Sequence, residues 1–155
     1  MSTAQIWQTA STDLESTLVL AAGIGSKLHG GEVIELISDL GGGKTAFVRG
    51  LAQGMGSSDH VRSPSFTLGN QYRAESLTLY HFDFYRLTQP GIMRQELAEI
   101  IEDPEAVVAV EWAEIVEAVL PAERLTITIK ATGENSREFS IEYPEKLEYL
   151  LPANT

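Results

Sequence analysis

The residues best suited to chemistry lie in a glycine-rich segment, residues 38–45, which reads Ser-Asp-Leu-Gly-Gly-Gly-Lys-Thr. Glycines without a Cβ let backbone N–H groups approach phosphate oxygens closely, and a helix beginning at Lys44 would direct its unpaired N–H groups at the same anion. Lys44 can reach the outer phosphates, and the hydroxyl of Thr45 can ligate Mg²⁺. The segment therefore predicts a phosphate-binding loop (P-loop). Its predicted contact residues are Asp39, Leu40, Gly41, Gly42, Gly43, Lys44 and Thr45.

The first position of this loop departs from the pattern G-x-x-x-x-G-K-[ST], because Ser38 stands where glycine is usual. A small residue fits there, although the turn must then form without the conformational freedom of glycine. The alternative interpretation is a glycine-rich turn that only caps a helix. The Lys-Thr pair directly after the third glycine favours the phosphate site over that alternative.

A nucleotide site also needs a carboxylate that holds Mg²⁺ opposite the P-loop threonine. Glu111 follows the apolar run 107–110, so we expect it at the carboxyl edge of a buried strand, where a metal would compensate its charge. Asp83 is the second candidate, on the polar face of an otherwise hydrophobic strand. The alternatives are a solvated carboxylate for Glu111 and a structural hydrogen bond for Asp83. Which of the two ligates the metal directly stays open.

Two further groups of residues could contribute. His81 and Asp83 lie on one face of the same predicted strand, but two ligands are too few to define a transition-metal site. The segment Ser63-Pro64-Ser65 carries hydroxyls in a polar loop, where nucleotide hydrolases keep segments that respond to the γ-phosphate. We interpret it as a switch, and the alternative is an ordinary turn.

The elements that must position these residues follow from hydrophobic periodicity. Thr12 and Glu15 fit a capping box at the start of a helix that runs to about Leu28, and Gly30-Gly31 ends it. Strands are predicted at 32–37, 66–72, 77–85, 107–110, 125–130 and 137–143, and helices at 44–54, 92–101 and 114–120. Residues 144–155 are predicted to be a tail with one helical turn at 145–150. The pattern predicts one α/β domain, residues 1–155: a P-loop NTPase-like three-layer sandwich with a mixed sheet, parallel at its centre and antiparallel at its edges.

Composition narrows the function classes. The chain has 155 residues, a net charge of −11 and no cysteine, which excludes disulfides and thiolate metal sites. An acidic surface repels nucleic-acid phosphates, so we expect no autonomous binding of RNA or DNA. No apolar stretch is long enough to span a bilayer, and the N-terminus lacks the basic start of a signal peptide. We therefore expect no membrane association and a cytoplasmic location.

The complete set of motifs resembles the TsaE family of bacterial P-loop ATPases in tRNA threonylcarbamoyladenosine (t6A) biosynthesis. The resemblance extends over about residues 10–143. It is carried by Asp39-Leu40-Gly41-Gly42-Gly43-Lys44-Thr45, Arg49-Gly50, Ser63-Pro64-Ser65-Phe66, His81-Phe82-Asp83-Phe84-Tyr85-Arg86-Leu87 and Glu111-Trp112.

The resemblance implies slow, Mg²⁺-dependent ATP hydrolysis in support of a TsaD–TsaB heterodimer, which transfers a threonylcarbamoyl group to adenosine 37 of tRNA. It implies that Thr45 and Glu111 ligate Mg²⁺ and that Asp83 positions the metal or the attacking water. Lys44 and Asp83 are thus the predicted catalytic residues, and Ser63-Pro64-Ser65 is the predicted switch.

Two other functions remain open from sequence. A P-loop kinase for a small molecule would share the loop but should carry an arginine-rich lid, whereas the arginines here are scattered. A nucleotide-dependent assembly module would bind ATP without hydrolysing it. The adenine contacts are not defined by any motif, and the segments at 10–12 and near Gly133 are the candidates.

Overall fold

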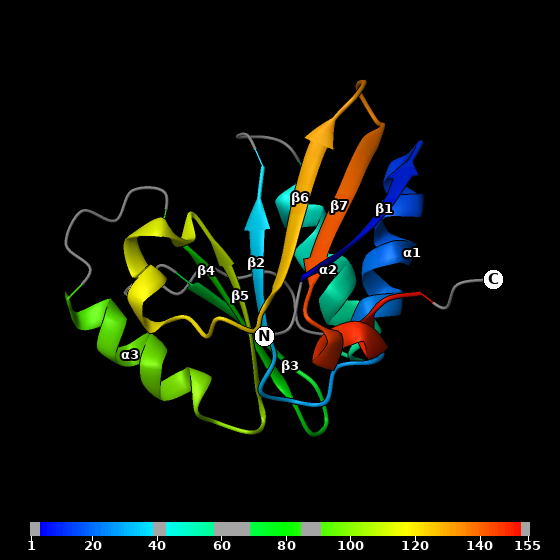
Figure 1. Ribbon diagram of the computed structural model, residues 1–155. Coiled ribbons are helices and arrows are strands. Elements are labelled where there is room, and N and C mark those ends of the chain that lie inside the picture. Colours follow the sequence, from blue (N-terminus) through cyan, green and yellow to red (C-terminus); the bar gives the residue numbers. More distant parts are fainter. Residues whose placement is uncertain (1–3, 39–42, 58–68, 85–90, 153–155) are drawn as a thin grey trace.

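One mixed β-sheet organises the protein (Figure 1). The computed structural model describes residues 4–38, 43–57, 69–84 and 91–152. Seven strands lie in the order β1-β7-β6-β2-β5-β4-β3. Their bounds are Gln5–Ser11 (β1), Val33–Ile37 (β2), Gly69–Arg73 (β3), Thr78–Asp83 (β4), Ala106–Glu111 (β5), Leu125–Ala131 (β6) and Arg137–Tyr143 (β7).

The centre of the sheet is parallel and its edges are antiparallel, as the sequence predicted. β2 pairs in parallel with both β5 and β6, and β5 pairs in parallel with β4. The β3–β4, β6–β7 and β7–β1 pairs are antiparallel. Because β2, β4 and β5 run in the same direction, the residues at their carboxyl ends meet at one edge of the sheet.

Helices cover the two faces of the sheet unequally. Helices α1 (Leu14–Gly25) and α2 (Lys44–Gly54) pack on one face, and α3 (Gly91–Ile101) and the 3-10 helix η1 (Ala113–Val119) pack on the other (Figure 1). Strand β5 is buried on both sides, because Val107 and Ala109 join the first core cluster while Val108 and Val110 join the second. On the side of α3 and η1, strands β6, β7 and β1 instead carry polar side chains that include Thr128 and Lys130.

Two local features near the N-terminus differ from the sequence prediction. The N-terminal strand β1 was not predicted, because Ile6 and Trp7 are adjacent and the strand shows no clean alternation. Helix α1 is capped by Asp13 rather than Thr12: Asp13 has an extended φ of −151°, and its Oδ1 accepts the N–H of Ser16 at 2.7 Å.

The C-terminal segment, predicted to be a tail, packs into the core. Residues Glu145–Leu150 form the 3-10 helix η2, as predicted, but Leu147, Leu150 and Leu151 are buried in the same core cluster as residues of α1 and α2. Within the residues that the structure describes, no helix is both long and apolar enough to cross a membrane.

Candidate phosphate site

The predicted phosphate site begins where the chain turns from β2 into α2. Gly43 is the N-cap residue of α2 and has a φ of 105°, a left-handed conformation that favours glycine. A Cβ at this position would also lie 3.3 Å from Nε of Arg137, so Gly43 lies close to the side chain of this first residue of β7. Helix α2 then starts at Lys44, which directs the unpaired N–H groups of its first turn toward the edge of the sheet.

Lys44 is buried at this edge, with an exposed fraction of 7%. Its Nζ lies 3.2 Å from the carbonyl oxygen of Ser38 and 3.3 Å from Oε1 of Glu111. The ammonium group also lies over the ring of Trp112, 5.0 Å from the ring centroid, a cation–π geometry. The lysine of the motif is therefore held by a carboxylate, a carbonyl and an aromatic ring.

Glu111 is the last residue of β5 and is 5% exposed, so the prediction that it ends a buried strand is correct. Its two carboxylate oxygens have different partners. Oε1 faces Lys44, and Oε2 accepts a hydrogen bond from Nε2 of His81. Burial alone would raise the pKa of Glu111, but His81 and Lys44 outweigh burial and hold the pKa below its ordinary value. The carboxylate is therefore ionised at neutral pH.

His81 is the residue of this site whose partner the sequence interpretation missed. It lies on β4, is 7% exposed, and faces the same side of the sheet as Leu79 and α2. The sequence placed His81 and Asp83 on one face but did not pair β4 with β5. That parallel pairing brings His81 level with Ala109 and therefore within reach of Glu111.

Asp83 and Thr45 lie at the same edge of the sheet. Asp83 ends β4, directly opposite Glu111 in the register, and its side chain is exposed. Thr45 is the second residue of α2 and is also exposed. In the described ranges no three His, Cys, Asp or Glu side chains form a metal cage. Oxygen ligands at one edge, with only one or two carboxylates, suit Mg²⁺, which retains water and binds substrate phosphates.

The backbone turns sharply after Glu111. Trp112 has a φ of 58° and a ψ of 52°, a left-handed conformation that costs of the order of 1–3 kcal/mol for a bulky residue. The turn ends β5 and starts η1, with Ala113 buried beneath it. The strained residue thus lies between the buried carboxylate and the helix that covers the opposite face, and its ring contacts Lys44.

Several predicted residues lie outside the described ranges. These are Asp39, Leu40, Gly41 and Gly42 of the loop and Ser63, Pro64 and Ser65 of the switch. Their roles stay predictions.

The two candidate adenine segments are connected to Gly43 through Arg137. Ser11 pairs with Arg137 across β1 and β7, and Arg137 is the residue that approaches Gly43. Its Nη1 donates to the carbonyl oxygens of Gly133, Glu134 and Ser136, which fixes the β6–β7 turn. Sequence reasoning did not identify Arg137, because no motif connects it to the loop.

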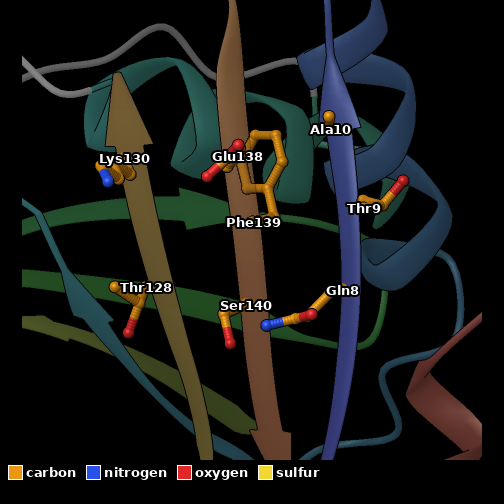
Figure 2. Close-up of a pocket in the computed structure, with 8 residues that line it drawn as sticks. All are labelled: Gln8, Thr9, Ala10, Thr128, Lys130, Glu138, Phe139 and Ser140. Atoms are coloured by element: carbon orange, nitrogen blue, oxygen red, sulfur yellow. The ribbon is translucent and has the colours of Figure 1, made fainter. Parts of the chain in front are cut away.

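A separate hollow lies on the half of the sheet that α3 and η1 leave uncovered. Its volume is about 510 Å³, and Figure 2 shows that Gln8, Thr128, Lys130, Glu138 and Ser140 are among the residues lining it. Lys130 and Glu138 have opposite charges, so this hollow lacks the positive potential that a polyphosphate needs. It contains neither Lys44 nor Glu111.

Comparisons with known proteins agree on one family. The family described as "Threonylcarbamoyl adenosine biosynthesis protein TsaE" matches residues 11–139. The chain is 38% identical to the tRNA threonylcarbamoyladenosine biosynthesis protein TsaE of Bacillus subtilis, over 86% of this chain and 82% of that protein. It is also 38% identical to the TsaE protein of a Nostoc species, over 83% and 81% of the two chains. The crystal structure of Bacillus subtilis YdiB superposes with a TM-score of 0.75 and 30% identity, covering 97% and 94% of the chains.

Proposed function

The chain belongs to the TsaE family, and we propose that it acts in t6A biosynthesis as a Mg²⁺-dependent ATPase that supports a threonylcarbamoyl transferase. The observation that supports this proposal is the position of Lys44. It begins a helix directly after a glycine in a left-handed turn, and it faces an ionised carboxylate at the end of the adjacent parallel strand. A phosphate-binding lysine opposite a buried acidic residue is the arrangement that phosphoryl-transfer sites of this class require.

The residues of the chain then have separate tasks. Lys44 exchanges its contact with Glu111 for the outer phosphate oxygens, and the N–H groups of the first turn of α2 bind the phosphates beside it. Thr45 and Glu111 would hold Mg²⁺, which when bound neutralises charge on the β- and γ-phosphate oxygens. Asp83, exposed at the same edge, orients the attacking water or a water of the metal shell.

The proposed partner is the TsaD–TsaB heterodimer. A protein with a net charge of −11 has no general means of holding tRNA by itself, because affinity for nucleic acid depends on neutralising phosphates. A role in tRNA modification then requires contact with the enzyme that holds the tRNA. ATP hydrolysis serves the turnover of that enzyme, and this chain does not carry out the transfer.

The test is ATP hydrolysis measured for the protein alone and with the heterodimer, with Glu111→Gln as the matched variant. Glutamine keeps the shape of the side chain and removes its charge. We expect slow hydrolysis that the heterodimer changes, and loss of Mg²⁺-dependent hydrolysis in Glu111→Gln while nucleotide still binds without Mg²⁺. Binding without hydrolysis, even with the heterodimer present, would instead identify an assembly module. Transfer of phosphate to a small molecule would identify a kinase.

A further inference from the structure

His81 has no role in the proposed function, yet it is one of the most buried polar residues of the protein. It lies on β4, whose parallel neighbour β5 is buried on both faces. Buried polar groups are expensive unless they are hydrogen-bonded, and His81 meets this need at Oε2 of Glu111. The imidazole N–H is the donor of this bond and the carboxylate oxygen is its acceptor.

The two partners of Glu111 differ in how freely they can move. Lys44 has a long flexible side chain, and phosphate binding would draw its ammonium group away from Oε1. The imidazole of His81 is short and rigid, and its strand is hydrogen-bonded on both sides, to β3 and to β5. When Lys44 moves to the phosphates, Oε2 therefore stays with His81, and Oε1 becomes the oxygen that faces the start of α2.

We propose that His81 is a positioning residue that fixes the Glu111 carboxylate so that Oε1 alone is presented to Mg²⁺. This inference rests on the proposed function and deepens it, because it names the residue that orients the Glu111 carboxylate. His81 also prevents the carboxylate from following Lys44 toward the nucleotide. Hydrogen-bonding partners of metal ligands typically contribute a factor of about 10–100 to metal affinity or activity.

The experiment determines ATP affinity by calorimetric titration at a series of Mg²⁺ concentrations. Its result is the Mg²⁺ concentration that gives half of the maximal increase in ATP affinity, called here the Mg²⁺ requirement. His81→Phe keeps an aromatic ring but removes the donor. We expect it to raise the required Mg²⁺ concentration by about 10- to 100-fold while leaving Mg²⁺-free ATP binding within about twofold. His81→Gln places an amide N–H near the position of Nε2 and should restore most of the loss.

Two matched variants separate positioning from a general effect. His29→Gln removes a histidine that stacks on Tyr149, remote from the phosphate loop, and should leave the Mg²⁺ requirement unchanged. In a Glu111→Gln background, His81→Phe should have no further effect on that requirement, because the group it positions has lost its charge. If His81→Phe does not fold, His81→Asn replaces it, since the shorter amide does not reach Oε2.

The outcomes distinguish this inference from the proposed function. An unchanged Mg²⁺ requirement in His81→Phe, beside a Mg²⁺-dependent wild type, would overturn the positioning role alone. Equal losses of Mg²⁺-free and Mg²⁺-dependent binding would also overturn it, because they indicate a structural role. A wild-type protein that binds no ATP, or binds it without regard to Mg²⁺, would overturn the proposed function itself.

Discussion

Lys44 has a structural contact in addition to its proposed role in catalysis. A lysine at a helix N-terminus is usually solvated, and from sequence alone its removal would seem harmless to the fold. The structure places it instead at 7% exposure against Glu111, so its removal leaves a buried carboxylate with one fewer partner.

Lys44→Met tests both contacts at once, because methionine keeps the stem beside Trp112 and removes the charge. Loss of a charge-assisted hydrogen bond, about 1.5–3 kcal/mol, predicts a loss in ATP affinity of about tenfold to a hundredfold. We also expect a lower melting temperature, with His81 still holding Glu111. Calorimetric titration and thermal melting provide the two readings. Wild-type ATP affinity in this variant would exclude Lys44 from the phosphate site.

At the scale of single residues the sequence predicted two side chains that the structure brings together, Lys44 and Glu111, but not every pairing. Lys44 and Glu111 were predicted because motif spacing and the end of an apolar run point to them. The contact between His81 and Glu111 depends on which strands are neighbours and in what register, and no local pattern contains that information.

Helix α2, which begins at Lys44 of the candidate phosphate site, packs closely on α1. Gly50 lies at their crossing, where an added Cβ would be 2.6 Å from Cβ of Ala21 and 2.9 Å from the carbonyl oxygen of Leu18. Gly23 lies on α1 with nothing within 4 Å of the same added atom. Both glycines lie in helices, but Gly50 has no room for a side chain whereas Gly23 has.

Gly50→Ala and Gly23→Ala form a matched pair for chemical denaturation. Overpacking at Gly50 predicts a loss of about 1–3 kcal/mol in the free energy of unfolding. Alanine at Gly23 should instead add about 0.5–1 kcal/mol through helix propensity. If both variants changed stability in the same direction, the close approach of the helices would not be what glycine at position 50 provides.

The C-terminal helix η2 contacts the segment just before β2 through a hydrogen bond between Tyr149 and Glu32. The Tyr149 hydroxyl donates to Oε2 of Glu32 at 2.6 Å, and the Tyr149 ring stacks on His29. Burial and then the Glu32 carboxylate raise the pKa of Tyr149. A raised folded-state pKa stabilises the protein below the unfolded value of about 10, and this stability is lost as the pH rises above it.

Tyr149→Phe should therefore cost about 1 kcal/mol in the free energy of unfolding at pH 7. The difference from wild type should shrink above about pH 10, where the unfolded tyrosine ionises. Urea denaturation of both proteins at the two pH values gives the comparison. A difference that is independent of pH would mean that the hydrogen bond to Glu32 does not contribute.

Elements with strong periodicity were the most predictable. The apolar run before Glu111 identified β5, and the alternation from Leu125 identified β6. The edge strand β1 and the burial of η2 were not predicted, since both depend on packing against residues more than a hundred positions away in the chain.

For the molecule as a whole, ATP should act through contact with partner proteins. A ligand shifts a conformational equilibrium only by its differential affinity for the two states. Linkage then requires that ATP change the affinity for the heterodimer by the same factor by which the heterodimer changes the affinity for ATP. We expect heterodimer titrations with ATP, ADP and no nucleotide to give different affinities. Ser63→Ala/Ser65→Ala should reduce these differences more than it reduces ATP binding, and identical affinities in all three states would contradict a switch.

The fold class and the family were accessible from the sequence, because buried parallel strands and the glycine-rich segment before Lys44 leave strong local patterns. The uneven covering of the sheet was not, since it depends on where α3 and η1 pack. This matters for locating the site, because the uncovered half forms the hollow on β1, β6 and β7 (Figure 2), and neither Lys44 nor Glu111 lines that hollow.

Amide hydrogen exchange with and without Mg²⁺-ATP tests most directly whether the nucleotide binds at Lys44 and Glu111 or in the hollow on β1, β6 and β7. Ligand binding slows exchange at the amides it orders. We predict that protection concentrates at the first turn of α2, from Gly43 onward, and at Glu111 and Trp112. Protection confined to the strands that line the hollow, with no change at the start of α2, would contradict the assignment of the phosphate site to Lys44 and Glu111.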